Sequence, residues 1–77
     1  MPRRTRADPL ACRLGEAIRE TRERRGETLD AVAHRLEGTG AKYLGELELG
    51  WHVPKITTVK QIADALETSL SELFRGL

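Results

Sequence analysis

The sequence predicts a single compact all-α domain made of five short helices. Apolar residues recur at the three-to-four-residue spacing of amphipathic helices, and no stretch is expected to form a strand. Ser or Thr stands before three of these stretches and Gly stands after three, as is typical of helix starts and stops. A chain of 77 residues has room for one core, which must be aliphatic because aromatic residues are only 4%.

The first predicted helix runs from about residue 14 to residue 25, and Gly26 ends it. Thr28 is expected to cap the second helix, because its hydroxyl can accept a hydrogen bond from a main-chain amide of the first turn. This second helix should end near residue 36, where Gly38 interrupts the apolar pattern.

Thr39 is expected to cap the third helix, which ends at Gly50 in a left-handed conformation. A loop over residues 51–56 leads into the fourth helix, at about residues 57–66, and Ser69 caps a short last helix. The apolar stripes expected on these three helices are Tyr43, Leu44 and Leu47, then Val59, Ile62, Ala63 and Leu66, then Leu70, Leu73 and Phe74.

The second and third helices and the glycine turn between them make a helix-turn-helix unit over residues 28–54. The commonest use of this shape is to present its second helix to the major groove of DNA. The surface that this second helix would present to DNA nevertheless carries little positive charge. From residue 37 to residue 53 the only Lys or Arg is Lys42, against Glu37, Glu46 and Glu48.

The net charge of +1 is unevenly distributed. Residues 1–13 carry four arginines and one aspartate, a local charge of +3, which leaves −2 for residues 14–77. We therefore divide the chain into a basic flexible arm, residues 1–13, and a helix-turn-helix domain, residues 14–77. Because phosphate contacts dominate affinity for DNA, the arm is expected to contribute to binding, and a solubilising tail is the alternative. Its candidate residues are Arg3, Arg4 and Arg6.

Other classes of function find little support. The single Cys12 excludes an intramolecular disulfide, and neither Cys nor His occurs at the spacing of metal ligands. No nucleophile stands with a base and no carboxylate pair marks a cleft, so we expect no enzyme, cofactor or metal site. No apolar segment resembles a signal or a membrane span, so the expected location is the cytoplasm.

A set of residues along positions 14–74 follows a known pattern in order and spacing. It comprises Leu14-Gly15, Ile18-Arg19, Arg22, Gly26, Thr28, Val32-Ala33, Leu36, Tyr43-Leu44, Leu47-Glu48, Gly50, Pro54, Ile62-Ala63-Asp64-Ala65-Leu66 and Ser69-Leu70-Ser71-Glu72-Leu73-Phe74. The set resembles the Xre/Cro/C1-like helix-turn-helix family. This resemblance implies a five-helix lambda-repressor-like fold and a prokaryotic, nucleoid-associated transcriptional regulator that binds a palindrome in double-stranded DNA as a homodimer. Antitoxins and restriction-modification controllers also occur in the family.

Carried over by position, the resemblance makes the helix from Gly40 the recognition helix. The implied base-reading residues are Gly40, Ala41, Lys42, Gly45 and Glu46, and the candidate backbone contacts are Arg22, Thr28, Thr39, His52 and Lys55. Arg22 and Glu48 match a pair that ties the first helix to the third. For Lys42 and Glu46 the alternative is a solvated pair at four-residue spacing. Phe74 and Leu77 are the expected contacts of a homodimer.

Four residues depart from what a strong phosphate binder would carry. Leu29 replaces a Gln that contacts phosphate in the family, Glu37 lengthens the turn, and Glu46 and Trp51 add no positive charge. Trp51 either covers the edge of the core or anchors a partner. These departures keep a second class of function open, in which the chain is a helix-turn-helix-fold protein-interaction module or an antitoxin-like partner with weak or no DNA binding.

Overall fold

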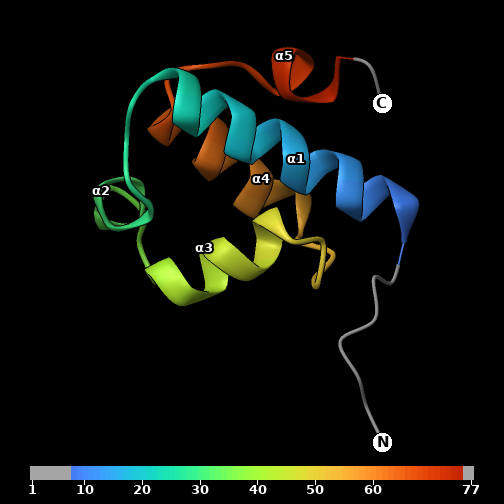
Figure 1. Cartoon of the computed structure of the whole chain (residues 1–77), viewed down its shortest axis with the longest axis horizontal. Helices are drawn as coiled ribbons and strands as arrows, with labels where there is room; N and C mark the ends of the chain where they lie inside the picture. The colour runs from blue at the N-terminus through green and yellow to red at the C-terminus, as the bar shows by residue number, and fades with distance from the viewer. Residues whose placement is uncertain (1–7, 76–77) are drawn as a thin grey trace, which may run out of the picture.

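The computed structural model describes residues 8–75, which form five α-helices and no strand. The helices are α1 Pro9–Arg24, α2 Leu29–His34, α3 Ala41–Glu48, α4 Ile56–Ala65 and α5 Leu70–Phe74. In Figure 1, α1 crosses the middle of the molecule, with α5 on one side and with α2 and α3 on the other. The prediction of five helices without strands is confirmed over this range. None of the described helices has the length and apolarity needed to cross a membrane.

Helix α1 begins at Pro9, five residues earlier than predicted. Asp8 caps it, since the amide of Leu10 donates to Asp8 Oδ1 at 2.8 Å. A proline suits the first helical position because the amide it lacks would have no partner within the helix. The assignment of residues 9–13 to a flexible arm was therefore wrong. Arg3, Arg4 and Arg6 lie outside the described residues, as does Leu77.

Two of the three predicted caps are confirmed. The amide of Ala31 donates to Thr28 Oγ1 at 3.0 Å, and the amide of Glu72 donates to Ser69 Oγ at 3.1 Å. The third was wrong, because Gly40 rather than Thr39 occupies the cap position of α3. Gly40 has no side chain to offer, so no side-chain hydrogen bond caps α3.

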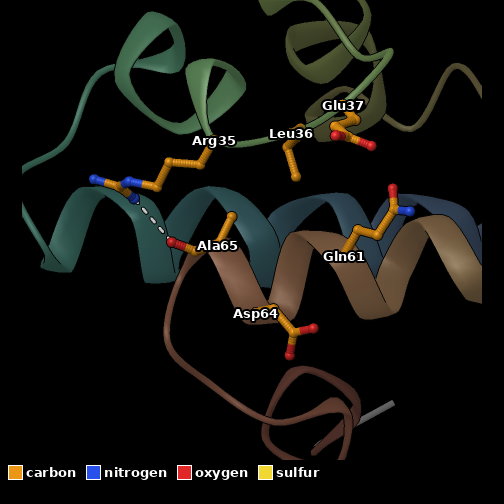
Figure 2. A pocket seen from close by; sticks show the side chains of 6 residues that line it. All are labelled: Arg35, Leu36, Glu37, Gln61, Asp64 and Ala65. Atoms are coloured by element: carbon orange, nitrogen blue, oxygen red, sulfur yellow. Dashed lines mark hydrogen bonds between the residues drawn. The ribbon is translucent and has the colours of Figure 1, made fainter.

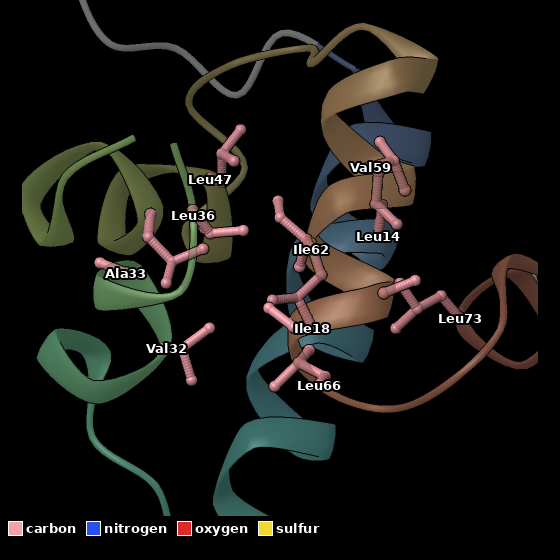
Figure 3. Packing of buried hydrophobic residues seen from close by; sticks show 13 residues of the cluster. Leu14, Ile18, Val32, Ala33, Leu36, Leu47, Val59, Ile62, Leu66 and Leu73 are labelled. Atoms are coloured by element: carbon pink, nitrogen blue, oxygen red, sulfur yellow. The ribbon is translucent and has the colours of Figure 1, made fainter. Parts of the chain in front are cut away.

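Aliphatic side chains from all five helices form one core (Figure 3). Burying each of the larger ones contributes about 1.5–3 kcal/mol, so no single helix of this length could stay folded without the others. The eight largest fully buried side chains are Ile18, Val32, Leu44, Leu47, Val59, Ile62, Leu66 and Leu73. The four positions predicted as buried in the fourth helix are all buried, although one of them, Leu66, is the cap residue after α4. Leu70 and Phe74 pack half-buried at the edge of the core.

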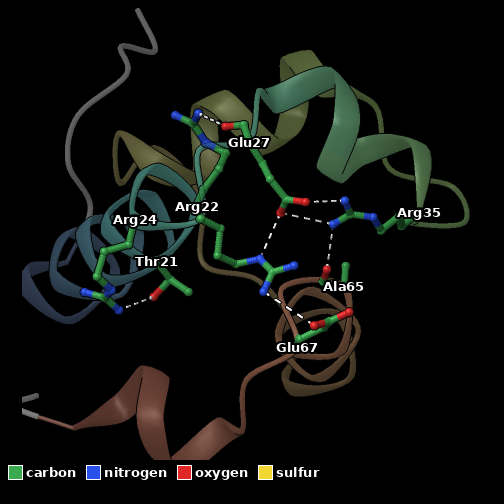
Figure 4. Close-up of polar contacts among 8 residues, drawn as sticks. Thr21, Arg22, Arg24, Glu27, Arg35, Ala65 and Glu67 are labelled. Carbon is green, nitrogen blue, oxygen red and sulfur yellow. Dashed lines mark hydrogen bonds and ion pairs between the residues drawn. The ribbon is translucent and has the colours of Figure 1, made fainter.

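A polar network joins the start of the helix-turn-helix unit to the end of α4 (Figure 4). The Glu27 carboxylate accepts hydrogen bonds from Arg35 and from Arg25, and these bonds lower the pKa of Glu27 to about 2. Arg35 Nη1 also donates to the carbonyl oxygen of Ala65 at 2.8 Å. The network thereby supplies a hydrogen-bond donor to one of the carbonyls at the carboxyl end of α4, which has no partner within the helix.

Helices α1 and α3 cross at Gly15, where their backbones touch. A Cβ atom at Gly15 would lie 2.3 Å from the carbonyl oxygen of Leu47 and 2.7 Å from that of Glu48. These are main-chain atoms of α3 and its end, which cannot turn aside as a flexible side chain can. Only glycine therefore allows α3 to lie this close to α1.

Replacing Gly15 by Ala should lower the free energy of unfolding by about 1–3 kcal/mol, because overpacking at the crossing outweighs the better helix propensity of alanine. Urea denaturation measures the effect. Gly45→Ala is the matched control, since a Cβ there meets only Leu29 Cδ1, at 3.4 Å. Equal denaturation midpoints for the two variants would show that Gly15 does not set the crossing.

Candidate nucleic-acid interface

Helix α3 turns one face to the core and the opposite face to solvent. Leu44, Leu47 and Glu48 are its buried residues. At about 100° per residue, Lys42, Glu46 and Leu49 point away from the core, with Tyr43 and Gly45 on the two flanks. We call these five residues the outer face of α3. The Lys42 side chain is 91% exposed, so its ammonium group extends into solvent.

A buried ion pair braces α3 against α1. Arg22 Nε donates to Glu48 Oε2 at 2.7 Å and Arg22 Nη2 donates to Glu48 Oε1 at 3.0 Å, a bidentate contact. The two side chains are 13% and 6% exposed. The hydrogen bonds to Glu48 raise the pKa of Arg22, and its Nη1 donates to the carbonyl oxygen of Glu27. The pairing implied by the family resemblance is confirmed.

The chain folds back on α3 immediately after the helix ends. The amide of Gly50 donates to the carbonyl of Leu47 at 3.0 Å, and the amide of Trp51 donates to that of Glu46 at 3.1 Å. Gly50 has a φ of +80°, the left-handed conformation predicted for it. This Schellman-type ending directs the loop over residues 51–55 back along the outer face of α3.

His52 is the residue that this reversal brings onto α3. Its Nε2 lies 2.7 Å from Glu46 Oε1, and its ring centroid lies 4.8 Å from that of Tyr43, with the planes tilted by 32°. Lys42 Nζ lies 3.9 Å from Glu46 Oε2. Lys42 and Glu46 thus form the ion pair at four-residue spacing that was the alternative to base reading, with His52 added from the loop.

The start of α2 lies beside Gly45 of α3. A Cβ on Gly45 would reach Leu29 Cδ1 at 3.4 Å, and Leu29 itself packs half-buried against the core. The residue that replaces the family's phosphate-contacting Gln therefore holds α2 on α3. Thr28, one position earlier, is exposed at this end of α2.

Comparison with known families agrees with this geometry. The model of a helix-turn-helix domain matches residues 13–74, which are 62 of the 77 residues. The chain belongs to the Xre-like helix-turn-helix family. Neither a search of curated proteins nor a search of solved structures found a match. A helix-turn-helix domain indicates DNA as the partner, and the family is typically non-catalytic.

The helix-turn-helix domain brings the predicted site residues into two groups. Gly40, Ala41, Lys42, Gly45 and Glu46 lie on α3 or at its start, and His52 and Lys55 lie in the loop that follows it. Thr39 is half-buried in the turn before α3. Arg22 is paired with Glu48, so a phosphate contact by Arg22 stays a prediction.

Tyr43 is the site residue that sequence reasoning placed wrongly. The apolar stripe assigned it to the core, but it is 36% exposed and its ring contacts His52. It lies about 40° around the helix from Leu47 but about 100° from Leu44, which places it at the edge of the buried face. The one usable signal was its aromatic type, since a tyrosine beside a core position often keeps its hydroxyl in water.

Most cations of the helix-turn-helix domain are paired with carboxylates. The pairs are Arg19 with Glu23, Arg22 with Glu48, Arg25 with Glu27 and Glu67, Arg35 with Glu27, Lys42 with Glu46, Lys60 with Asp64 and Arg75 with Glu72. Within residues 8–75, Arg13, Arg24 and Lys55 have no carboxylate at ion-pair distance. Lys55 lies in the loop that follows α3, next to the candidate interface.

A cleft on another side of the domain lies between the turn after α2 and helix α4 (Figure 2). Glu37, the residue that lengthens the turn, lines it together with Gln61 and Asp64 of α4. Arg35 directs its guanidinium group to the carbonyl of Ala65 (Figure 2). The two acids make this cleft unsuited to phosphate. Across residues 8–75, no group of three or more His, Cys, Asp or Glu could hold a metal ion.

Replacing Arg22 by Leu should lower the free energy of unfolding by about 3 kcal/mol or more, because Glu48 is then left buried without its partner. The double variant Arg22→Leu/Glu48→Leu should lose less than the single variant. Urea denaturation compares them with Arg19→Ala, which breaks an exposed pair and should cost at most about 1 kcal/mol. A double variant that loses more stability than Arg22→Leu alone would contradict the brace.

Proposed function

We propose that this protein is a sequence-specific DNA-binding transcriptional regulator that binds a palindromic operator as a homodimer. The observation that carries the proposal is the orientation of α3, which the core and the brace hold with Lys42 projecting into solvent. An ammonium group at this position can donate to the acceptors of guanine in the major groove. Gly45, on the flank of this face, is small enough to let the backbone of α3 approach the bases, whereas Ala41 packs half-buried against the core.

Contacts to the phosphate backbone would come from the elements that flank α3. Helix α3 has no side-chain cap, so main-chain amides at its start can donate to a phosphate near Gly40. Thr28 at the start of α2, Thr39 in the turn, and His52 and Lys55 beyond α3 are the further candidates. Because these groups supply little positive charge, the amino-terminal arginines are an important part of the proposal.

Removing residues 1–7 should weaken binding to DNA and flatten its dependence on salt, because Arg3, Arg4 and Arg6 are lost. The slope of log K against log salt should fall by about 0.9 for each arginine that contacts phosphate. The cut precedes Asp8, so the cap of α1 is retained. Affinity measured between 50 and 200 mM salt, as an order-of-magnitude range, tests the arm. An unchanged slope would place the arm away from DNA.

The proposed homodimer uses Phe74 and Leu77. Phe74 lines an apolar groove that also involves Leu10, Val53 and Ile56. These three side chains are 56%, 67% and 58% exposed, an unusual concentration of large apolar surface on a small domain. A second copy covering the groove would remove that surface from water and would pair two recognition helices for the two halves of a palindrome.

Selection of genomic DNA fragments at low salt with the purified chain tests the regulator directly. An enriched palindrome supports the proposal, and retention of no fragment above background overturns it. In that case the exposed apolar groove would favour the second candidate function, a protein-interaction module, because Val53 and Ile56 could anchor a protein partner.

Lys42→Ala should lower affinity for the selected site by roughly tenfold and relax the preference at one base pair. Lys60→Ala is the matched control, because Lys60 also forms an ion pair at four-residue spacing but lies on α4. Fluorescence anisotropy with the selected duplex and its single-base variants measures both. Equal losses for the two variants would show that α3 does not read the bases.

A further inference from the structure

The contact between His52 and Glu46 joins a loop residue to a residue assigned to base reading. His52 follows the Schellman-type ending of α3, so main-chain hydrogen bonds of Gly50 and Trp51 fix where the loop begins. Its Nε2 then lies 2.7 Å from Glu46 Oε1. The Glu46 side chain is only 20% exposed, so this contact holds the carboxylate close against α3, on the face that is proposed to meet DNA.

The chemistry of the two groups fixes the direction of the hydrogen bond. An ionised carboxylate only accepts hydrogen bonds, so His52 Nε2 carries the proton and donates it to Glu46. A neutral imidazole in this contact must therefore be the Nε2–H tautomer. The hydrogen bond holds the carboxylate in one orientation, so its oxygens keep fixed positions relative to α3.

Tyr43 restrains the imidazole from the other side. The rings of Tyr43 and His52 are 4.8 Å apart between centroids and tilted by 32°, a packed aromatic contact. Rotation of the imidazole about its bond to Cβ would break this packing and would carry Nε2 away from Glu46. One residue of α3 thus positions the loop histidine, and the histidine positions another residue of α3.

We propose that His52 is a positioning residue that determines the base preference of α3 by holding Glu46, and that Tyr43 holds His52 in place. This inference rests on the proposed function. A carboxylate in the major groove can accept from the exocyclic amine of cytosine, but it also repels nearby phosphates. A Glu46 fixed by His52 presents its acceptor at one place, so the preference for cytosine depends on a residue outside the recognition helix.

Selection of DNA fragments with a set of His52 variants tests this role. The amide nitrogen of Gln reaches about as far from the backbone as Nε2, whereas that of Asn reaches only as far as Nδ1. H52Q should therefore keep the preference for cytosine, and H52N and H52A should lose about tenfold of it, at the base pair where E46Q also loses it. The double variant H52A/E46Q should match E46Q alone, because His52 acts on the base preference only through the carboxylate that E46Q removes.

Several results would overturn the proposal. H52A could select the same site with the same preference, H52N could behave as H52Q, or H52A could lose affinity equally for every sequence. The last result would make His52 only a structural or phosphate-contacting residue. If the unmodified protein selects no site, the proposed function fails and this role fails with it, whereas a selected site with an unchanged preference in H52A overturns this role alone.

The contact itself has a test that needs no DNA. Nitrogen-15 NMR of the imidazole in the full-length free protein should show the proton of neutral His52 on Nε2. The Nδ1–H tautomer would contradict the hydrogen bond to Glu46 and with it the proposed role. His34 is exposed on α2, and its imidazole makes no hydrogen bond or ion pair with the described residues, so it serves as the internal reference for an unconstrained ring.

Discussion

The close crossing of α1 and α3 is the constraint on which the rest of the structure depends. Gly15 lets the two backbones touch, and a few residues further along α1 the Arg22–Glu48 pair closes the same contact. With α3 held in this way, Leu44 and Leu47 turn one side of the helix into the core. The side that remains exposed is consequently fixed in direction, which a surface that recognises another molecule requires.

The charges of the domain limit how it could bind DNA. Most of its cations are engaged in ion pairs within the fold, and Glu46 brings negative charge to the outer face of α3. In the proposed function, affinity would come largely from main-chain amides, Lys55 and the amino-terminal arginines, and specificity from the few side chains of α3. The contact between Glu46 and His52 fits this division, because it orders an acid that would otherwise only weaken binding.

Much of the fold could be predicted because it depends on local chemistry. Thr28, Ser69 and Gly50 act through hydrogen bonds or backbone angles within a few residues, and the apolar spacing of α4 is a property of one helix. Pro9 was misread because a proline interrupts a helix in its interior but favours its first position. Thr39 was wrongly predicted as the cap of α3 because both Thr and Gly occur at helix caps. Thr39 and Gly40 are adjacent, and the sequence alone does not say which of them occupies the cap position.

The candidate site was predictable only in part, because some of its contacts depend on residues far from local sequence patterns. The pairing of Arg22 with Glu48 followed from a family pattern, whereas the contact of His52 with Glu46 depends on how a loop reverses after α3. Tyr43 looked like a core residue because it stands four positions before Leu47, only about 40° around the helix, whereas it lies at the edge of the buried face. Such tertiary details are decided by packing, which leaves no periodic signal in the sequence.

The central claim is that the outer face of α3 meets DNA. Mapping amide chemical-shift changes on the full-length protein, titrated with its selected duplex, tests it most directly. We expect the largest changes at Lys42, Gly45 and Glu46, with further changes at the start of α2 and over residues 52–55. Large changes over α4 and the cleft beside Glu37, with α3 unaffected, would contradict it.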